Sequence, residues 1–219
     1  MKYLNKLIFR TARFYLAVFL YGDKLYFLYL CDIILKVNYT EWTEKVKSKL
    51  KRKNQILFSK DSECFNELKF LIEQQNHRAM ALWALELSEE AVRVLEEKYP
   101  EEIRPKEALN ASKLWAFGEI RMREAQRKIL DCHAFAKEID SLEDIALCHA
   151  IGHGCAVVHT AGHAMGFPMY ELTAIVRKYG IENAKEAAES RIMHYIERLI
   201  YCSQQEPSYK GKWADFMLK

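Results

Sequence analysis

The sequence predicts an all-α protein: a single multi-helix domain of antiparallel helices around one buried central helix. Two observations lead to this prediction. Apolar residues recur at helical spacing over most of the chain, and no stretch alternates apolar and polar residues for long enough to indicate a strand. The 219 residues include only 8 glycines and 4 prolines, which favours long helices with short connections, and the chain is long enough to bury a core.

The central helix is predicted from a stretch without charge. Between Asp144 and Glu171 the chain has no acidic residue, lysine or arginine, and it is rich in glycine, alanine and histidine. Ser141, three residues before Asp144, resembles the start of a capping box, while Gly166 and Pro168 indicate an end. We therefore expect one helix over about residues 141–165. Its glycines and histidines favour a buried position in a protein core over a membrane span.

The other helices follow in order from their apolar stripes and their breakers. Pro100 ends one stripe, Pro105 suits the first turn of the next helix, and Gly118 and Gly180 suit helix ends. The predicted helices cover about residues 65–72, 80–95, 105–117, 120–139, 169–179 and 181–202.

The two ends of the chain are expected to differ from the domain at 61–203. Residues 1–40 form an apolar N-terminal segment, which starts basic like a signal peptide but shows no small-residue cleavage site. Its apolar runs are shorter than the ~20 residues of a spanning helix. It is interpreted as a helical appendage on the domain, a membrane-surface anchor within residues 1–37, or an upstream extension outside the native product. Residues 41–60 form a basic linker or helix, and residues 204–219 a tail.

Composition bears on partners and compartment. The net charge of +3 is small and the basic residues are scattered among acids, which argues against a nucleic-acid partner. The six cysteines show no Cys-x-x-Cys pair, so a reduced, cytoplasmic protein with buried thiols fits better than a disulfide framework. The oligomeric state is left open.

Four histidines in the central stretch could carry chemistry. On an ideal helix His149, His153, His159 and His163 would fall within about 120° of one another, and imidazoles four residues apart can share a Zn or Fe ion or a haem. Neither pair contains the glutamate of a His-Glu-x-x-His helix, and the stretch supplies no carboxylate. Core histidines with hydrogen-bonded rings are therefore favoured over a metal site and over acid–base catalysis.

No complete catalytic motif is present. The chain has no Gly-x-Ser-x-Gly elbow, and the Gly152-x-Gly154 pair lacks the third glycine and the lysine of a phosphate loop. Adjacent Cys and His side chains, as at Cys148-His149, point about 100° apart on a helix. We therefore predict that the protein is not an enzyme.

Several short motifs in a fixed order resemble a known family, the bacterial "putative immunity proteins", which are small helical domains predicted to neutralise polymorphic toxins. The similarity covers about residues 76–170, and the family usually has Asp at the position of Glu86. The motifs are Trp83-Ala84-x-Glu86-x-x-Glu89, Pro100, Arg104-Pro105-x-x-Ala108, Trp115-x-x-Gly118-Glu119-Ile120, Ala125-x-Arg127, His133-Ala134-x-Ala136, Gly152-His153 and His159-x3-His163-Ala164-x-Gly166.

This resemblance implies an all-α cytoplasmic protein without catalytic activity or a cofactor, which binds a toxin or effector protein through an interface of about 1,600 Å². Aromatic residues of the tail, Tyr209, Trp213 and Phe216, are candidate anchors. The alternative is a metal- or haem-binding enzyme or sensor that uses the four histidines. The family motifs point to a polar cluster, with a binding or structural role, that consists of Trp83, Glu86, Arg104, Trp115, Glu119, Arg127, His133 and His153.

Overall fold

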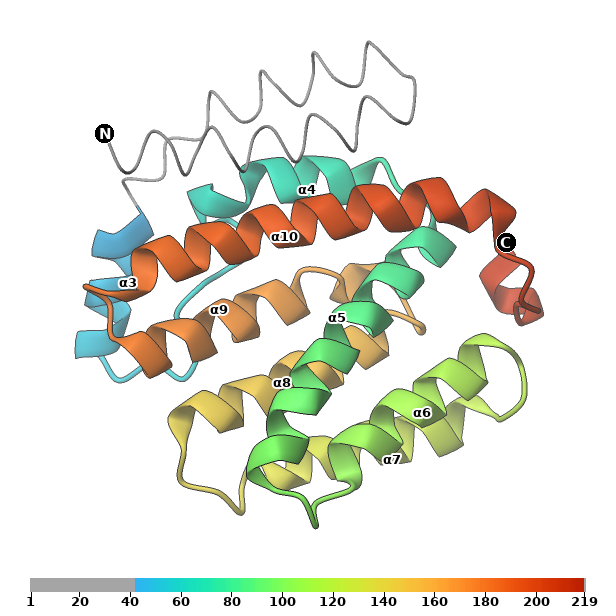
Figure 1. The fold of residues 1–219 in the computed structure, drawn as a ribbon, viewed down its shortest axis with the longest axis horizontal. Coiled ribbons are helices and arrows are strands. Elements are labelled where there is room, and N and C mark those ends of the chain that lie inside the picture. Colours follow the sequence, from blue (N-terminus) through green and yellow to red (C-terminus); the bar gives the residue numbers. More distant parts are fainter. Residues whose placement is uncertain (1–41, 219) are drawn as a thin grey trace. The chain divides into compact units, whose positions relative to one another are not determined.

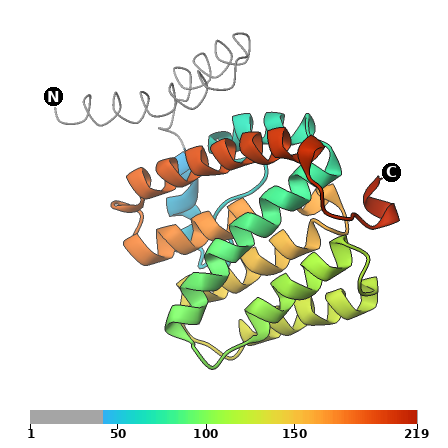
Figure 2. The same ribbon diagram turned by 45° about the vertical axis from the view of Figure 1, so that its right-hand side comes forward.

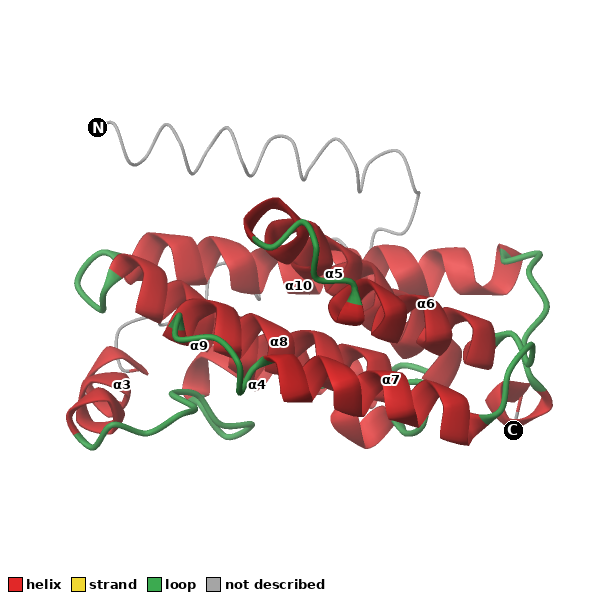
Figure 3. Ribbon diagram, turned by 90° about the horizontal axis from the view of Figure 1, so that it is seen from below, coloured by secondary structure: helices red, strands yellow, loops and turns green. Residues whose placement is uncertain are grey.

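A computed structural model describes residues 42–218 of the chain, and the expectations for residues 1–41 lie outside the described residues. The described residues belong to one compact all-α unit (Figure 1), and Figure 3 shows helices and loops without a strand among them. The α-helices are α3 (Trp42–Lys51), α4 (Asn66–Glu73), α5 (His77–Lys98), α6 (Arg104–Ala116), α7 (Met122–Phe135), α8 (Leu142–Ala156), α9 (Gly166–Tyr179) and α10 (Ala184–Gln205). Short 3-10 helices are η1 (Glu63–Phe65), η2 (Ala161–His163), η3 (Glu206–Ser208) and η4 (Asp215–Leu218).

Helix ends lie close to the predicted breakers. The Asn76 side chain accepts a hydrogen bond from the backbone of Ala79 and caps α5, and Ser141 caps α8 in the same way through Asp144. Gly118 and Gly180 follow α6 and α9 with positive φ angles, 78° and 70°, which side chains with a Cβ rarely adopt. Local sequence chemistry therefore accounts for these boundaries.

The predicted central helix is shorter than expected. α8 ends at Ala156 instead of about residue 165, and the chain turns before η2, where the Thr160 side chain accepts a hydrogen bond from the backbone of Gly162. Gly166 and Pro168, interpreted as the end of one helix, lie instead in the first turn of α9. Proline tolerates this position because the first turn needs no backbone donor there.

α8 nevertheless lies at the centre of the fold. It contacts α5, α6, α7 and α9, and α5 runs diagonally across it (Figures 1 and 2). α10 packs on α5 and α9 and lies beside α4. Small residues of α8, among them Ala150, Gly152 and Gly154, are buried at these contacts. The small side chains allow neighbouring helices to approach closely.

The segments at either end of the predicted domain also have structure. Residues 42–51 form α3, with Trp42 and Val46 buried. Near the C-terminus, the backbone of Ala214 donates a hydrogen bond to the carbonyl of Ala116, and Trp213 is buried. Of the three tail aromatics expected to anchor a partner, Trp213 therefore packs against the protein itself, whereas Tyr209 and Phe216 are half-buried. No helix within residues 42–218 combines the length and the apolar character that crossing a membrane requires.

Gly154 tests the close packing of α8. A Cβ at this position would overlap Oγ of Ser88 and lie 3.1 Å from the carbonyl oxygen of Ala84 on α5. We expect Gly154→Ala to lower the free energy of unfolding by about 1–3 kcal/mol, despite the better helix propensity of alanine. Urea denaturation would measure the change.

Gly162→Ala is the matched control, because its Cβ would meet nothing closer than 3.6 Å. We expect a change within about 0.5 kcal/mol for the control. Equal effects of the two substitutions would contradict the packing argument.

Candidate functional site

The eight polar residues predicted from sequence do not form one cluster. Trp83 and Glu86 lie on α5, facing α10, whereas Trp115 stacks on His159 and on Phe216 at the end of α6. The eight residues therefore lie in separate regions of the domain. Two of these regions are polar clusters in which several side chains contact one another.

The remaining predicted residues are distributed over α6, α7 and α8. Arg104 pairs with Glu102 and Glu138 through hydrogen bonds of 2.6 Å, at the start of α6. Glu119 and Arg127 are exposed. His133 on α7 and His153 on α8 are in ring contact, with centroids 6.0 Å apart.

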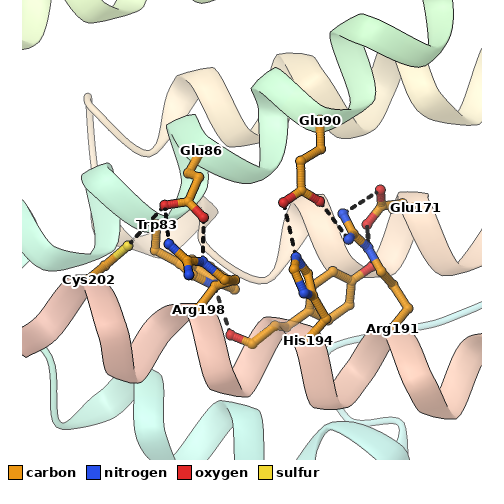
Figure 4. A network of polar contacts seen from close by, with 9 residues as sticks. Trp83, Glu86, Glu90, Glu171, Arg191, His194, Arg198 and Cys202 are labelled. Carbon is orange, nitrogen blue, oxygen red and sulfur yellow. Dashed lines mark hydrogen bonds and ion pairs between the residues drawn. The ribbon is translucent and has the colours of Figure 1, made fainter. Parts of the chain in front are cut away.

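The first polar cluster connects α5 with α10 and is shown in Figure 4. Glu86 forms an ion pair with Arg198, whose Nη2 lies 2.9 Å from Glu86 Oε2, and the Cys202 thiol also contacts this carboxylate. Beneath this pair, the buried indole of Trp83 donates a hydrogen bond of 2.9 Å to the carbonyl of Tyr195. Trp83 and Glu86 therefore both fasten α5 to α10.

Arg191 is the centre of the same network and joins three helices. Its Nη1 lies 2.6 Å from Glu90 on α5, and its Nε and Nη2 lie 2.7 and 2.9 Å from the carboxylate of Glu171 on α9. Tyr195 donates to Glu171 as well, at 2.6 Å, and His194 contacts Glu90 (Figure 4). Arg191 and Glu171 were not predicted from the sequence, because nothing in the local sequence of either residue signals a contact with a residue 20 positions away on another helix.

The charges of this network compensate one another. Burial by itself would raise the pKa of Glu90, but His194 and Arg191 outweigh it and lower that pKa to about 2. Burial opposes the charge of Arg191 too, yet Glu171 and Glu90 raise the pKa of its guanidinium above the ordinary value. Every charged group in the network has an internal partner, which is the arrangement of a structural clamp.

The four histidines predicted to share one helix face do not do so. His159 and His163 lie beyond the end of α8, and His159 stacks on Trp115 with ring centroids 6.0 Å apart. A shared face would require α8 to continue to residue 165, but α8 ends at Ala156. Within residues 42–218 no group of three or more His, Cys, Asp or Glu side chains is arranged to hold a metal ion.

A different set of imidazoles forms the second polar cluster. We define the histidine cluster as His133 on α7, His149 and His153 on α8, and His163 in η2. The Nδ1 atoms of His133 and His149 are 2.9 Å apart, so one ring donates this hydrogen bond and the other accepts it. The ring centroids of His153 and His163 lie 5.8 Å apart, and Tyr170 of α9 stacks on His153 at 5.1 Å.

Two glycines make room for the rings of this cluster. A Cβ on Gly152 would overlap Cε1 and Nε2 of His133, and a Cβ on Gly166 would lie 2.5 Å from Nδ1 of His153. Any residue other than glycine would displace these imidazoles. The family-like motifs Gly152-His153 and His163-Ala164-x-Gly166 therefore contain glycine where an imidazole ring needs the space. The sequence could not reveal this reason, because it depends on the position of α7.

The histidine cluster is uncharged at neutral pH. Burial, with a smaller contribution from the neighbouring imidazoles, lowers the pKa of His133 and that of His153 to about 4. Burial also lowers the pKa of His149 and of His163, and the Lys137 ammonium lowers that of His149 further. Within the described part of the chain no carboxylate is hydrogen-bonded to these four rings. Unlike the α5–α10 network, this cluster has no counter-charge.

The described cysteines are free, buried thiols. Burial raises the pKa of Cys64, Cys148, Cys155 and Cys202 to about 12 and that of Cys132 well above its ordinary value. Thiols in this state are protonated at neutral pH and are poor nucleophiles. Their arrangement favours a packing role.

Comparison with known proteins gives one finding. The family model described as "Imm-5 like putative immunity protein" matches residues 70–198, which is more than half of the chain. The matched region extends from α4 to Arg198 on α10 and includes the histidine cluster and all of the α5–α10 network except Cys202. No curated protein and no solved structure matches the sequence.

Arg191 should contribute strongly to stability, because its removal would leave Glu171 and Glu90 without their shared cation. The Arg191 side chain is 18% exposed and the Glu171 side chain 9% exposed. We expect Arg191→Ala to lower the free energy of unfolding by about 3–5 kcal/mol in urea denaturation.

Lys106→Ala is the control for this substitution, because Lys106 pairs with Glu96 on the surface and its side chain is 57% exposed. We expect a loss of about 1 kcal/mol or less there. A similar loss for both variants would refute the role of Arg191 as a clamp.

The histidine cluster predicts a pH dependence of stability. The folded-state pKa of His133 and of His153 is about 4, and the unfolded value is about 6.5. The unfolded chain therefore binds more protons between these values, so this contribution to stability is complete above pH 6.5 and is lost as pH falls toward 4. We expect each of the two groups to contribute on the order of 1–3 kcal/mol.

Urea denaturation between pH 4.5 and 7.5 would measure this loss. In His133→Gln we expect the free energy of unfolding to depend less steeply on pH. Side-chain NMR of the folded protein would follow the two imidazoles directly. Titration of both rings near pH 6.5 would contradict the prediction.

Proposed function

The chain belongs to the family of Imm-5 like putative immunity proteins, and on this premise we propose that it binds a toxin protein and blocks its activity without catalysis. The family match over residues 70–198 is the observation that carries this proposal. A toxin is the kind of partner that an immunity protein has, and inhibition would follow from occupying the working surface of the toxin in a one-to-one complex.

The chemistry of the described residues supports a binding role. The buried thiols are protonated, the histidine cluster is neutral, and the α5–α10 network uses its charges internally. None of these groups combines a nucleophile with a base that could activate it. An inhibitor needs a stable surface rather than an activated group, and the clamp around Arg191 supplies such stability.

The cytoplasm is the proposed site of action. The five free cysteines of the described residues suit a reducing compartment, and a toxin that acts inside cells has to be blocked there. We further propose that the protein acts without a resident metal or haem, because the histidines do not converge on a common position.

Co-expression tests the proposal. Any toxin domain encoded beside the gene for this chain would be expressed in a bacterial host with and without the chain, and surviving colonies counted. We expect the chain to restore growth by several orders of magnitude and to co-elute with the toxin as a stoichiometric complex. Failure to restore growth, with both proteins present at comparable levels, would refute the proposal.

Elemental analysis and an absorption spectrum of the untagged protein test the cofactor part separately. We expect no stoichiometric Zn or Fe and no haem absorption band. A stoichiometric metal that is lost in His153→Ala would instead make the histidine cluster a metal centre.

A further inference from the structure

A cavity of about 490 Å³ lies where α8 begins and where α3 and α9 end. The apolar side chains of Leu50, Leu142, Val176 and Ile181 form part of its lining. Leu142, in the first turn of α8, is 54% exposed, so the cavity is open to solvent. Walls of this kind favour binding of an apolar group, because the surface of that group is then removed from water.

The guanidinium of Arg177 also lines this cavity, and no carboxylate within residues 42–218 pairs with it. Its Nη2 donates a hydrogen bond of 2.9 Å to the carbonyl oxygen of Asn54, which is a neutral group. Burial lowers the pKa of Arg177, and no acid acts on this pKa in the opposite direction. Arg177 thus differs from the four arginines that each pair with a glutamate, which are Arg78, Arg104, Arg191 and Arg198.

The end of α3 positions the carbonyl that Arg177 contacts. The backbone of Asn54 donates a hydrogen bond of 3.0 Å to the carbonyl of Lys49. The backbone of Lys53 donates one of 2.9 Å to the carbonyl of Leu50, which completes a Schellman turn. The carbonyl groups at the ends of α3 and α9 carry partial negative charge, which stabilises the guanidinium without neutralising it. Other N–H groups of Arg177 are therefore left for an anion in the cavity.

Most acids around the cavity are already paired. Lys98 lies 3.0 Å from the first and 2.6 Å from the second of two consecutive acids, and Lys178 lies 3.6 Å from the first. Lys47 lies 3.1 Å from an acid that follows α9, and 3.3 Å from Glu44. The acids that line the cavity, or that adjoin a lining residue in the sequence, are Asp140, Glu143, Asp144 and Glu182. Of these, Asp140 is exposed and has no cation paired with it within residues 42–218.

The uncompensated charges of this region are mostly positive. Counting Arg177, five cations lack a carboxylate partner within residues 42–218. Two surplus carboxylates oppose them, that of Asp140 and one of the two that share Lys47. This excess of positive charge favours an anionic partner. The other four cations surround Leu50 at the end of α3 and are Lys49, Lys51, Arg52 and Lys53.

The combination of apolar walls and positive charge selects the kind of ligand. A guanidinium forms its strongest hydrogen bonds with a carboxylate or a phosphate. A phosphate polymer would use the cations but would leave the apolar walls without a contact. A small enclosed ligand does not suit a cavity that is open at Leu142. An extended peptide segment can fill the cavity with one apolar side chain and present a neighbouring carboxylate to Arg177.

From these observations we propose that the cavity and the basic end of α3 bind an acidic segment of a protein partner. One apolar side chain of this segment enters the cavity, and a carboxylate next to it pairs with Arg177. The identity of the partner rests on the proposed function, and the partner is the toxin. Binding weakens as salt is added, because Lys51, Arg52 and Lys53 are exposed and their charges are screened.

The first experiment titrates the full chain with a capped hexapeptide of alternating aspartate and leucine. Side-chain NMR would follow the methyl groups of Leu142 and the Nε–H of Arg177. We expect the peptide to shift both signals and to bind at least tenfold more tightly than a peptide with asparagine for aspartate or glycine for leucine. Unshifted Leu142 and Arg177 signals would overturn the inference. Equally tight binding of either control peptide, or of a thymidine hexanucleotide, would overturn it as well.

The second experiment repeats the toxin co-expression with variants at exposed positions, because Arg177 also makes a hydrogen bond within the protein. Leu142→Glu replaces an apolar side chain of the cavity by a carboxylate, which suits the first turn of α8 and so preserves folding. Lys51→Glu reverses a charge at the end of α3. Each variant is expected to lose at least tenfold in surviving colonies.

Leu130→Glu and Lys210→Glu are the matched controls, because they make the same changes at exposed positions of α7 and of the C-terminal tail. Neither residue lines the cavity, so both variants should protect as well as the wild type. Full protection by Leu142→Glu and Lys51→Glu, or equal losses in the two controls, would overturn the binding cavity and leave the proposed function intact.

The two experiments fail separately. If the wild-type chain gives no protection against the toxin, the proposed function fails, while the peptide titration still decides whether the cavity binds an acidic segment with apolar side chains.

Discussion

The half-buried guanidinium of Arg191 makes the interaction on which the arrangement of the long helices depends. It lies on α10 and reaches Glu171 on α9 and Glu90 on α5, so three helices meet at one cation. Removing a charge from water is costly, and the two carboxylates compensate that cost, one of which also accepts a hydrogen bond from the hydroxyl of Tyr195. Removing one member of this group of contacts therefore costs much of the free energy of unfolding. The hydrogen bond from Trp83 to Tyr195 extends the same attachment along α10.

The central helix illustrates how small residues decide packing. α8 contacts four other helices, and Gly154 lies so close to α5 that a methyl group would overlap Ser88. Close packing of this kind leaves the helix almost without charged residues, because a charge there would have no water and no partner. The same glycine-rich character creates the spaces in which the imidazoles of the histidine cluster lie.

The two polar clusters use the same residue types to different effect. In the α5–α10 network His194 has Glu90 as a partner, so the charges there are balanced. In the histidine cluster burial disfavours protonation of every ring, neighbouring imidazoles or Lys137 add to this effect, and no carboxylate pairs with a ring. A balanced network stabilises the domain at neutral pH. An unbalanced one is stable only while neutral.

Much of the fold was determined by the sequence alone, because helix formation depends on local patterns. The all-α class, the positions of most helices and the family resemblance followed from apolar spacing, from breakers such as Pro100, Gly118 and Gly180, and from the motifs around Trp83. Ser141 marked the start of α8 correctly, since capping involves only neighbouring residues.

Only the tertiary structure decided where α8 ends. It also decided which residues pair with Glu86 and Glu90, and which histidines form the histidine cluster. His133 and His149 meet because α7 packs on α8, and Arg191 meets Glu171 because α10 packs on α9. No local pattern records these contacts, because they depend on how far each helix extends and on which face it turns to its neighbour. The prediction that His159 and His149 share one helix face was wrong for this reason. The chain turns after Ala156, so helical spacing does not apply to His159.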